Sequence, residues 1–221
     1  MQQIEFYWDP MCPFAWVTSR WIVQVAEKLD MHVDWRFISL RFLNEAKDYD
    51  RDFPKGYTDL HMKGLRMLRV AASVRAVEGA DAMGPLYTAF GESIWDRSPV
   101  SGRDAMAEIG EPEHVRSVLA GLGIDLRHAA AADEETFDAE LRESTTFALT
   151  RAGSDVGTPI VAVDPPDGPA FFGPVISRVP DATEAIELWD AVMTLAKWPG
   201  FAEIKRTLRE MPQLPLLMRP S

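Results

Sequence analysis

A single cysteine, Cys12, is the residue of this chain best placed to do chemistry. It lies between an apolar alternating run that ends at Trp8 and a helical pattern that starts near Ala15. The first amides of a helix point toward the residue that precedes them, and the helix dipole favours negative charge there. We therefore expect the thiol to shift toward its thiolate, the form that attacks disulfides and electrophiles. Pro13 suits the first turn of such a helix, because its missing N–H costs nothing at that position.

Other candidate groups carry weaker signals. The alternative for Cys12 itself is a small buried apolar side chain, which is the commoner role of a lone cysteine. One cysteine excludes an internal disulfide and a cysteine-rich zinc site. Ser19 has no evident base beside it, so a serine hydrolase is excluded. No metal site is expected from the four histidines, which lack close ligand spacing and are predicted at surfaces or element ends: His32, His61, His114 and His128.

The composition is that of an acidic globular protein. The chain has 221 residues, of which 47% are hydrophobic, and a formal net charge of -11. Such a charge repels nucleic acid and anionic membranes, so neither is an expected partner. No apolar run is long enough to span a bilayer, and the N-terminus does not resemble a signal peptide. We expect a cytoplasmic protein, in which a free thiol stays reduced.

The elements expected around Cys12 form a strand–helix–strand unit. Residues 3–8 are predicted to be a strand buried on at least one face, residues 15–29 a helix, and residues 33–37 a strand with one wet face. Such units are normally parallel and right-handed. Residues 39–54 are expected to be irregular.

The middle of the chain is predicted to be helical. Its strand signal almost vanishes, and proline and glycine separate the helical patterns. The expected helices are residues 59–76, 85–95, 112–122 and 134–152. Asp133 is expected to cap the last of them.

Strand signals return toward the C-terminus. Residues 159–163 and 170–172, joined by a short turn, predict an antiparallel hairpin. Asp181 then caps a helix, with Glu184 at the capping-box spacing. This helix is expected to run to about Lys197 and to bury four side chains: Ile186, Leu188, Val192 and Leu195.

Two expectations concern the end of the chain. Residues 201–208 are predicted to form a last short helix. The proline-rich tail after Met211 is predicted to lie over the surface or on a partner, which allows a homodimer.

This order of elements predicts an α/β protein, a thioredoxin fold with a large all-helical insertion. The thioredoxin-like domain is expected to comprise residues 1–57 and 154–221, and the inserted helical domain residues 58–153. An insertion that enters at a connection leaves the core of the fold intact.

Four motifs spread along nearly the whole chain carry a family resemblance. They are WDPMCP at 8–13, VGTP at 156–159, FFGP at 171–174 and WPGF at 198–201. Through them the chain resembles the DsbA-like thioredoxin superfamily, and most of all the actinobacterial branch of mycothiol-dependent nitroreductases and DsbA-family oxidoreductases.

The resemblance implies roles for individual residues. Cys12 would be the attacking thiol. Pro159 would be the cis-proline facing it, and Thr158 would offer its backbone to a thiol substrate. The helical insertion would cover the site with an apolar pocket. The full set of expected thiol- or substrate-binding residues is Trp8, Pro13, Phe14, Trp16, Thr158 and Pro159.

Ala15 departs from the superfamily pattern. The disulfide oxidoreductases carry a second cysteine there, which releases their mixed disulfides. The motif Cys-Pro-Phe-Ala cannot do this alone, so the resemblance implies an external thiol, mycothiol or glutathione, as the cofactor, and no metal. The expected partners are that small thiol and a small apolar or aromatic substrate.

Three functions follow as hypotheses. The first is a thiol-dependent oxidoreductase or transferase that uses Cys12. The second resembles a kappa-class glutathione transferase or a 2-hydroxychromene-2-carboxylate isomerase, with the small thiol bound non-covalently. The third is a thioredoxin-fold binding module without turnover, motivated by the missing resolving cysteine at Ala15.

Overall fold

Four strands form a single sheet in the order β2-β1-β3-β4 in the computed structural model, which describes residues 2–99 and 106–218. The strands are β1 (Gln3–Trp8), β2 (His32–Phe37), β3 (Ile160–Val163) and β4 (Ala170–Phe172). β1 pairs parallel with β2 and antiparallel with β3, and β3 and β4 form the antiparallel hairpin. The predicted strand–helix–strand unit and the predicted hairpin are both confirmed.

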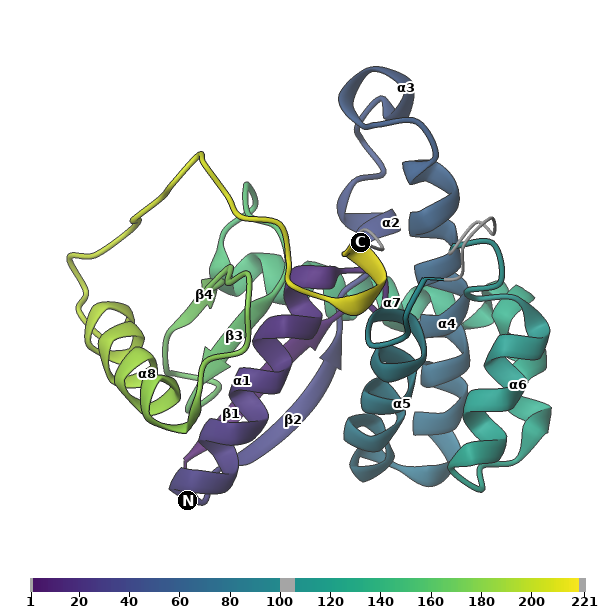
Figure 1. The fold of residues 1–221 in the computed structure, drawn as a ribbon, viewed down its shortest axis with the longest axis horizontal. Coiled ribbons are helices and arrows are strands. Elements are labelled where there is room, and N and C mark those ends of the chain that lie inside the picture. The colour runs from purple at the N-terminus through teal and green to yellow at the C-terminus, as the bar shows by residue number, and fades with distance from the viewer. Residues whose placement is uncertain (1, 100–105, 219–221) are drawn as a thin grey trace.

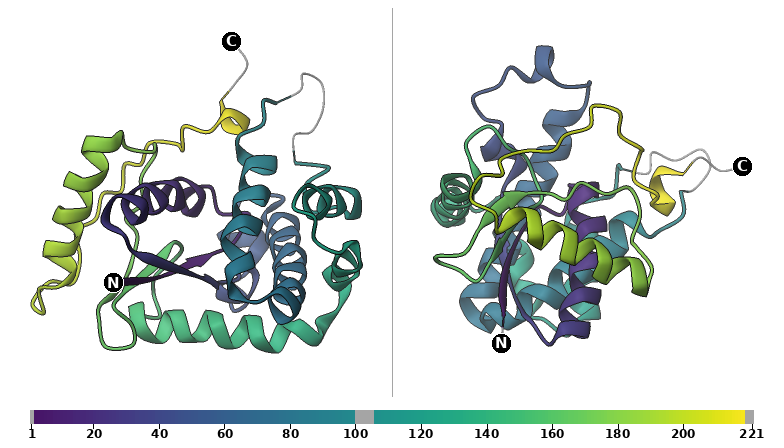
Figure 2. Two further views of the ribbon diagram at one scale, coloured as in Figure 1. Left: turned by 90° about the horizontal axis from the view of Figure 1, so that it is seen from below. Right: turned by 90° about the vertical axis from the view of Figure 1, so that its left-hand side faces the viewer.

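Helices cover both faces of this sheet (Figures 1 and 2). α1 (Pro13–Leu29) and α8 (Ala182–Ala196) lie on one face, where the Trp21 and Trp189 rings are 5.8 Å apart. α7 (Asp138–Ala152) lies across the other face, where Ala148 packs with Tyr7 and its neighbours. Because both faces are covered, the two central strands, β1 and β3, are almost entirely buried, whereas β2 and β4 at the edges are only partly buried.

A helical insertion connects β2 to β3 and stands beside the sheet in Figure 1. It contains six α-helices among the described residues: α2 (Leu40–Leu43), α3 (Tyr49–Asp52), α4 (Tyr57–Glu78), α5 (Met83–Trp95), α6 (Pro112–Gly121) and α7. Tyr87 of α5 joins it to the sheet, since its ring stacks on Trp8 at 4.4 Å and also contacts Phe6 and Trp35. The fold is the expected α/β class, a thioredoxin fold with a helical insertion.

Several boundaries inside the insertion differ from those expected. The helix predicted from residue 134 begins at Asp138, and the predicted cap, Asp133, forms an ion pair with Arg66 instead. Residues 126–133 and 135–137 are 3₁₀ helix instead. The segment expected to be irregular contains α2 and α3, whose first amides are capped by Ser39 and Asp48.

α8 begins as expected but buries a different face. Asp181 and Glu184 form the predicted capping box. The buried residues are Ala185, Trp189 and Met193, because α8 packs through one narrow face against α1. The prediction of four buried residues was wrong: Leu195 is exposed, and three are only half-buried, namely Ile186, Leu188 and Val192.

The end of the chain also differs from the prediction. Residues 201–208 contain no helix. Farther on, Leu214 and Leu216 are buried, and Pro215–Leu217 forms a single 3₁₀ turn. Among the described residues, no helix combines the length and hydrophobicity needed to cross a membrane.

Candidate functional site

Cys12 occupies the N-cap position of α1, at the junction of strand and helix where the sequence placed it. The backbone N–H of Ala15 donates to Cys12 Sγ over 3.4 Å, and the thiol reaches the carbonyl oxygen of Thr158 at 3.7 Å. Pro13 follows as the first helical residue. The local reason for this geometry is the proline, whose fixed φ suits the first turn and which needs no acceptor there.

The loop before β3 brings Thr158 against the thiol although the two residues lie 146 positions apart. The Thr158–Pro159 peptide bond is cis. Thr158 Oγ1 is buried and has no hydrogen-bond partner among the described residues. A polar atom of this kind is free to bond a ligand placed beside Cys12.

The pKa of Cys12 is shifted upward, whereas the sequence predicted a downward shift. Only 6% of the residue is exposed, and this burial raises the thiol pKa to about 12. The amides of Ala15 and Phe14 lower the pKa, but by less than burial raises it, and the nearby Asp9 raises it further. The predicted shift toward thiolate was therefore wrong for this closed structure, because loss of water outweighs the helix amides.

Asp9 is a second ionisable group at the site, and sequence reasoning missed it. Its carboxylate is fully buried, with Oδ1 accepting from Met11 N and Oδ2 from Leu40 N, each at 2.8 Å. Burial raises its pKa to about 7, so it titrates near neutral pH. The signal available in the sequence was an acidic residue directly after a buried strand and three positions before the cysteine.

The helical insertion packs directly on the motif. Trp95 Nε1 of α5 donates to the carbonyl oxygen of Pro10 at 2.9 Å. Gly64 of α4 lies so close to Asp9 that a Cβ there would be 2.6 Å from Oδ1. The contact with Gly64 helps to bury the Asp9 carboxylate, and Cys12 is likewise buried, with 6% of the residue exposed.

The predicted binding residues divide into two groups. Pro13 and Phe14 are half-buried beside Cys12, and Thr158 and Pro159 are buried in the facing loop. Two others lie in the core between sheet and insertion, where Trp8 stacks on Tyr87 and Trp16 Nε1 donates to Asp96 Oδ1 at 3.1 Å. For all six residues, contact with a ligand stays a prediction.

Two surface pockets lie away from the Cys12 thiol. One, of about 250 Å³, is lined by the ion-pair network of Glu5, Arg36 and Arg151, and the other, of about 350 Å³, lies beside Asp30 and Trp35. Neither is the apolar pocket over Cys12 that the family resemblance implied.

The histidines are more buried than expected. His61 and His128 are 5% and 3% exposed, bonded to Tyr49 Oη and Ser73 Oγ at 2.8 Å, so the prediction of surface positions was wrong for both. Within the described residues, no group of three or more His, Cys, Asp and Glu side chains could hold a metal ion.

Comparison with known proteins identifies similar chains. A family model described as Rv2466c-like, mycothiol-dependent nitroreductase Rv2466c, matches residues 11–206. The uncharacterised protein Rv2286c of Mycobacterium tuberculosis is 27% identical over 211 residues, covering 93% of this chain and 82% of that protein.

Solved structures support the fold. The probable DsbA oxidoreductase SCO1869 from Streptomyces coelicolor matches with a TM-score of 0.55 and 15% identity, covering 93% of this chain and 94% of that one. The cytosolic disulfide reductase DsbM from Pseudomonas aeruginosa matches with a TM-score of 0.52 and 19% identity, covering 88% of this chain and 100% of that one. At these identities the likeness concerns the fold.

Proposed function

Because this chain belongs to the Rv2466c-like family of mycothiol-dependent nitroreductases, we propose that it is a thiol-dependent oxidoreductase that pairs Cys12 with an external small thiol. The observation that carries the proposal is the position of Cys12. Its sulfur caps α1 and faces the Thr158 carbonyl, while Ala15 occupies the place where a second cysteine would stand. A thiol held in this way needs a partner thiol to complete a redox cycle.

The proposed cycle consumes two molecules of small thiol for each two-electron step. Cys12 and one mycothiol each give up one electron and one proton to an aromatic nitro group, which becomes a nitroso group and water. The two sulfurs are left joined as a mixed disulfide. A second mycothiol attacks this disulfide, releases Cys12 as a thiol and leaves as the mycothiol disulfide. Glutathione would serve in the same way.

Each site residue has a role in this proposal. Cys12 forms and breaks the disulfide, and Asp9, the buried acid three residues before it, is the group proposed to supply protons to the reduced substrate. The Thr158 backbone and its unpartnered hydroxyl hold the small thiol beside Pro159. Pro13 and Phe14, half-buried beside Cys12, provide the apolar surface for the aromatic substrate, and the buried Trp8 and Trp16 support the site from the core behind it.

The wider setting is proposed on the same basis. We expect the enzyme to act in the cytoplasm, where small thiols keep cysteines reduced. The helical segment 58–153 is proposed as a separate domain that regulates access to Cys12, since its α4 and α5 cover the motif.

Mass spectrometry tests the covalent step. Incubation with oxidised mycothiol or glutathione should give one adduct, on Cys12, and Cys12→Ser should give none. Reduction of a nitroaromatic with mycothiol should be lost in the same variant. If no adduct forms at neutral pH and Cys12→Ser reduces the substrate as fast as the parent, the proposal is wrong.

Ala15→Cys tests the need for an external thiol. The new cysteine would lie about one helical turn after Cys12, within reach of a Cys-X-X-Cys disulfide. We expect a gain of insulin reduction with a dithiol donor, which the parent and Cys12→Ser, Ala15→Cys should lack. Ala15 is fully buried, so the added sulfur should destabilise the protein by about 1–3 kcal/mol, and a thermal melt must accompany the assay.

A second group of functions is favoured by one observation, the raised pKa of the buried Cys12 thiol. It suits a site that binds a small thiol non-covalently, as in a kappa-class glutathione transferase or a 2-hydroxychromene-2-carboxylate isomerase, or a binding module without turnover. Thiol consumption distinguishes these cases. Stoichiometric consumption indicates reduction or transfer, a catalytic requirement indicates isomerisation, and no product at all indicates binding alone.

A further inference from the structure

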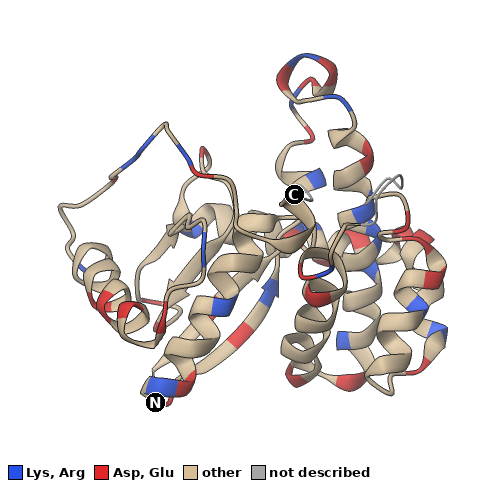
Figure 3. Cartoon of the chain, in the orientation of Figure 1, with Lys and Arg blue, Asp and Glu red and all other residues tan. Residues whose placement is uncertain are grey.

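The last described residues of the chain pack on the protein with one face. We call residues 212–218 the C-terminal strap. Along it, Pro212, Leu214 and Leu216 are buried, whereas Gln213 between the first two is exposed. The two leucines belong to the main hydrophobic core of the protein. Figure 3 shows charged residues on the arch that precedes the strap, but the strap itself has none, so apolar packing is its main attachment.

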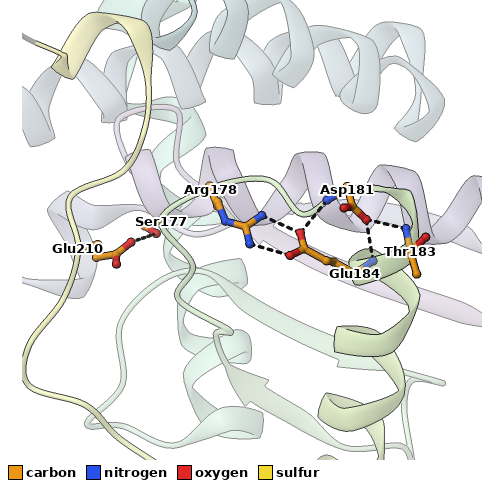
Figure 4. A network of polar contacts seen from close by, with 6 residues as sticks. All are labelled: Ser177, Arg178, Asp181, Thr183, Glu184 and Glu210. Atoms are coloured by element: carbon orange, nitrogen blue, oxygen red, sulfur yellow. Dashed lines mark hydrogen bonds and ion pairs between the residues drawn. The ribbon is translucent and has the colours of Figure 1, made fainter.

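Hydrogen bonds tie the start of the strap to the thioredoxin fold. Gln213 N donates to the carbonyl oxygen of Ser177 at 2.6 Å. Ser177 Oγ also donates to Glu210 Oε2 at 2.8 Å, as Figure 4 shows. Ser177 lies between β4 and α8. The chain on either side of Met211 is therefore anchored at one residue of the thioredoxin fold.

The other end of the strap lies on the insertion. The 3₁₀ turn Pro215–Leu217 contacts α5, and the left view of Figure 2 shows it as the yellow turn beside one end of that helix. Trp95, the last residue of α5, donates to the carbonyl oxygen of Pro10, two positions before Cys12. The strap thus connects the thioredoxin fold to the helix that packs on the cysteine motif.

The interface between α5 and the thioredoxin fold contains buried donors without acceptors. Trp8 stacks on Tyr87 of α5, and its buried Nε1 has no hydrogen-bond partner among the described residues. Arg20 donates through Nη1 to Thr88 Oγ1 of α5 at 3.1 Å, but its buried Nη2 likewise has no partner within the described part of the chain. Such donors cost free energy that water would return if the interface opened. Closure therefore depends on apolar packing, to which the strap contributes.

We propose that the C-terminal strap holds the insertion closed over Cys12, and that release of the strap sets how often the thiol becomes accessible. The inference rests on the proposed function, in which Cys12 must react although it is buried. Movement of α5 away from the motif would provide access. Because the strap is attached to both parts, this movement would expose Leu214 and Leu216 to water, which favours the closed state.

Alkylation of Cys12 by iodoacetamide in the native full chain tests the proposal. Leu216→Ala should make it at least about 30-fold faster, because loss of a buried leucine side chain shifts an equilibrium by that factor or more. Leu214→Ala should act in the same direction. Met218→Ala changes a residue of the same segment that is 58% exposed, and this matched control should react like the parent. Equal rates for Leu216→Ala and the parent overturn the proposal.

Met193→Ala distinguishes release of the strap from general loosening of the fold. Met193 is a buried residue of α8 and belongs to neither the strap nor α5. Urea titrations should show a lower free energy of unfolding for both Met193→Ala and Leu216→Ala, but only Leu216→Ala should speed the alkylation of native Cys12. If Met193→Ala speeds it as much, the thiol is exposed by general loosening and the proposal is wrong.

Adduct formation with oxidised glutathione separates the strap from the proposed oxidoreductase function. Leu216→Ala should form the Cys12 adduct faster than the parent, by the same factor as it is alkylated. Faster alkylation without any adduct would support the strap and contradict the oxidoreductase function. An adduct that forms at one rate in the parent and in Leu216→Ala would support that function and overturn the strap.

Discussion

Two helices of this protein, α1 and α8, begin with a side chain that accepts hydrogen bonds from the first amides. Cys12 accepts from Ala15 N at the start of α1, and Asp181 accepts from Thr183 N and Glu184 N at the start of α8. At α8 the network lies on the surface, where Arg178 also donates two hydrogen bonds to Glu184 (Figure 4). The two ends therefore share a backbone geometry but differ in access to water.

The electrostatic outcomes at these two ends are opposite. Arg178, followed by the Asp181 amide, lowers the pKa of Glu184 to about 2. Burial raises the pKa of Cys12 to about 12 in spite of the amides at α1. The comparison shows that burial sets the pKa at the start of α1, whereas an ion pair exposed to water sets it at the start of α8.

The largest expected effect concerns the reactivity of Cys12. Its pKa of about 12, against 9.0 for an ordinary thiol, leaves roughly a thousand-fold less thiolate at neutral pH. Iodoacetamide should therefore alkylate Cys12 in the native protein roughly a thousand-fold more slowly than in urea. The two rates are measured by mass spectrometry at one pH. A native rate equal to the unfolded one would mean that the helix amides dominate after all.

The free energy of unfolding should depend strongly on pH because of Asp9, and Asp9→Asn should remove this dependence. An acid whose folded-state pKa is raised contributes stability that is present below its unfolded pKa and lost as the pH rises through the folded value. For Asp9 the pKa is 3.8 in the unfolded chain and about 7 in the folded protein. Over this pH interval the folded protein should lose about 4 kcal/mol of stability. The free energy of unfolding of the parent, relative to Asp9→Asn, should fall by this order between pH 4 and 7.5.

Urea titrations at several pH values provide the measurement. His61 and His114, whose pKa burial lowers to about 4, contribute stability that rises over the same interval. Both histidines are present in parent and variant, so the difference between the two isolates Asp9. If the difference in unfolding free energy between parent and Asp9→Asn does not change between pH 4 and 7.5, Asp9 is ionised and solvated over that whole range.

Gly64→Ala tests how tightly the insertion covers the start of α1. The added methyl would lie 2.6 Å from Asp9 Oδ1, so the expected destabilisation is about 2 kcal/mol. Gly121→Ala, also in a helix, meets nothing within 4 Å and is the matched control, which should be neutral or stabilising. Equal melting temperatures for the two variants would refute close packing over Asp9.

Asp181→Ala removes the cap of α8 at the exposed end of the comparison. Loss of an N-cap side chain costs about 1 kcal/mol. Asp181→Ser keeps an accepting oxygen and should recover most of this loss in the same denaturation experiment. If Asp181→Ser is as unstable as Asp181→Ala, the cap hydrogen bonds contribute nothing.

Arg178→Met should have the smallest effect on stability, because the pair it forms with Glu184 is exposed and screened by salt. The pKa of Glu184, followed by NMR, should nevertheless rise from about 2 toward its ordinary value. An unchanged pKa would assign the shift to the hydrogen bond from the Asp181 amide.

Local signals in the sequence determined much of the fold. Alternating apolar residues predicted β1 and β2, and short apolar runs beside turn residues predicted β3 and β4. Pro13 marked the start of α1, and the Asp181–Glu184 spacing predicted the capping box. These features depend on neighbours within about one turn or one strand. For the same reason the sequence placed Cys12 correctly at the beginning of a helix.

Tertiary contacts decided the rest. The pKa values of Cys12 and Asp9 depend mainly on burial, and the residues packed against the motif, such as Thr158 and Gly64, come from distant parts of the chain. Asp133 pairs with Arg66 and caps no α-helix, and residues 201–208 form no helix although one was predicted there. Desolvation and packing depend on which elements meet in space, so a pattern of neighbouring residues does not contain them.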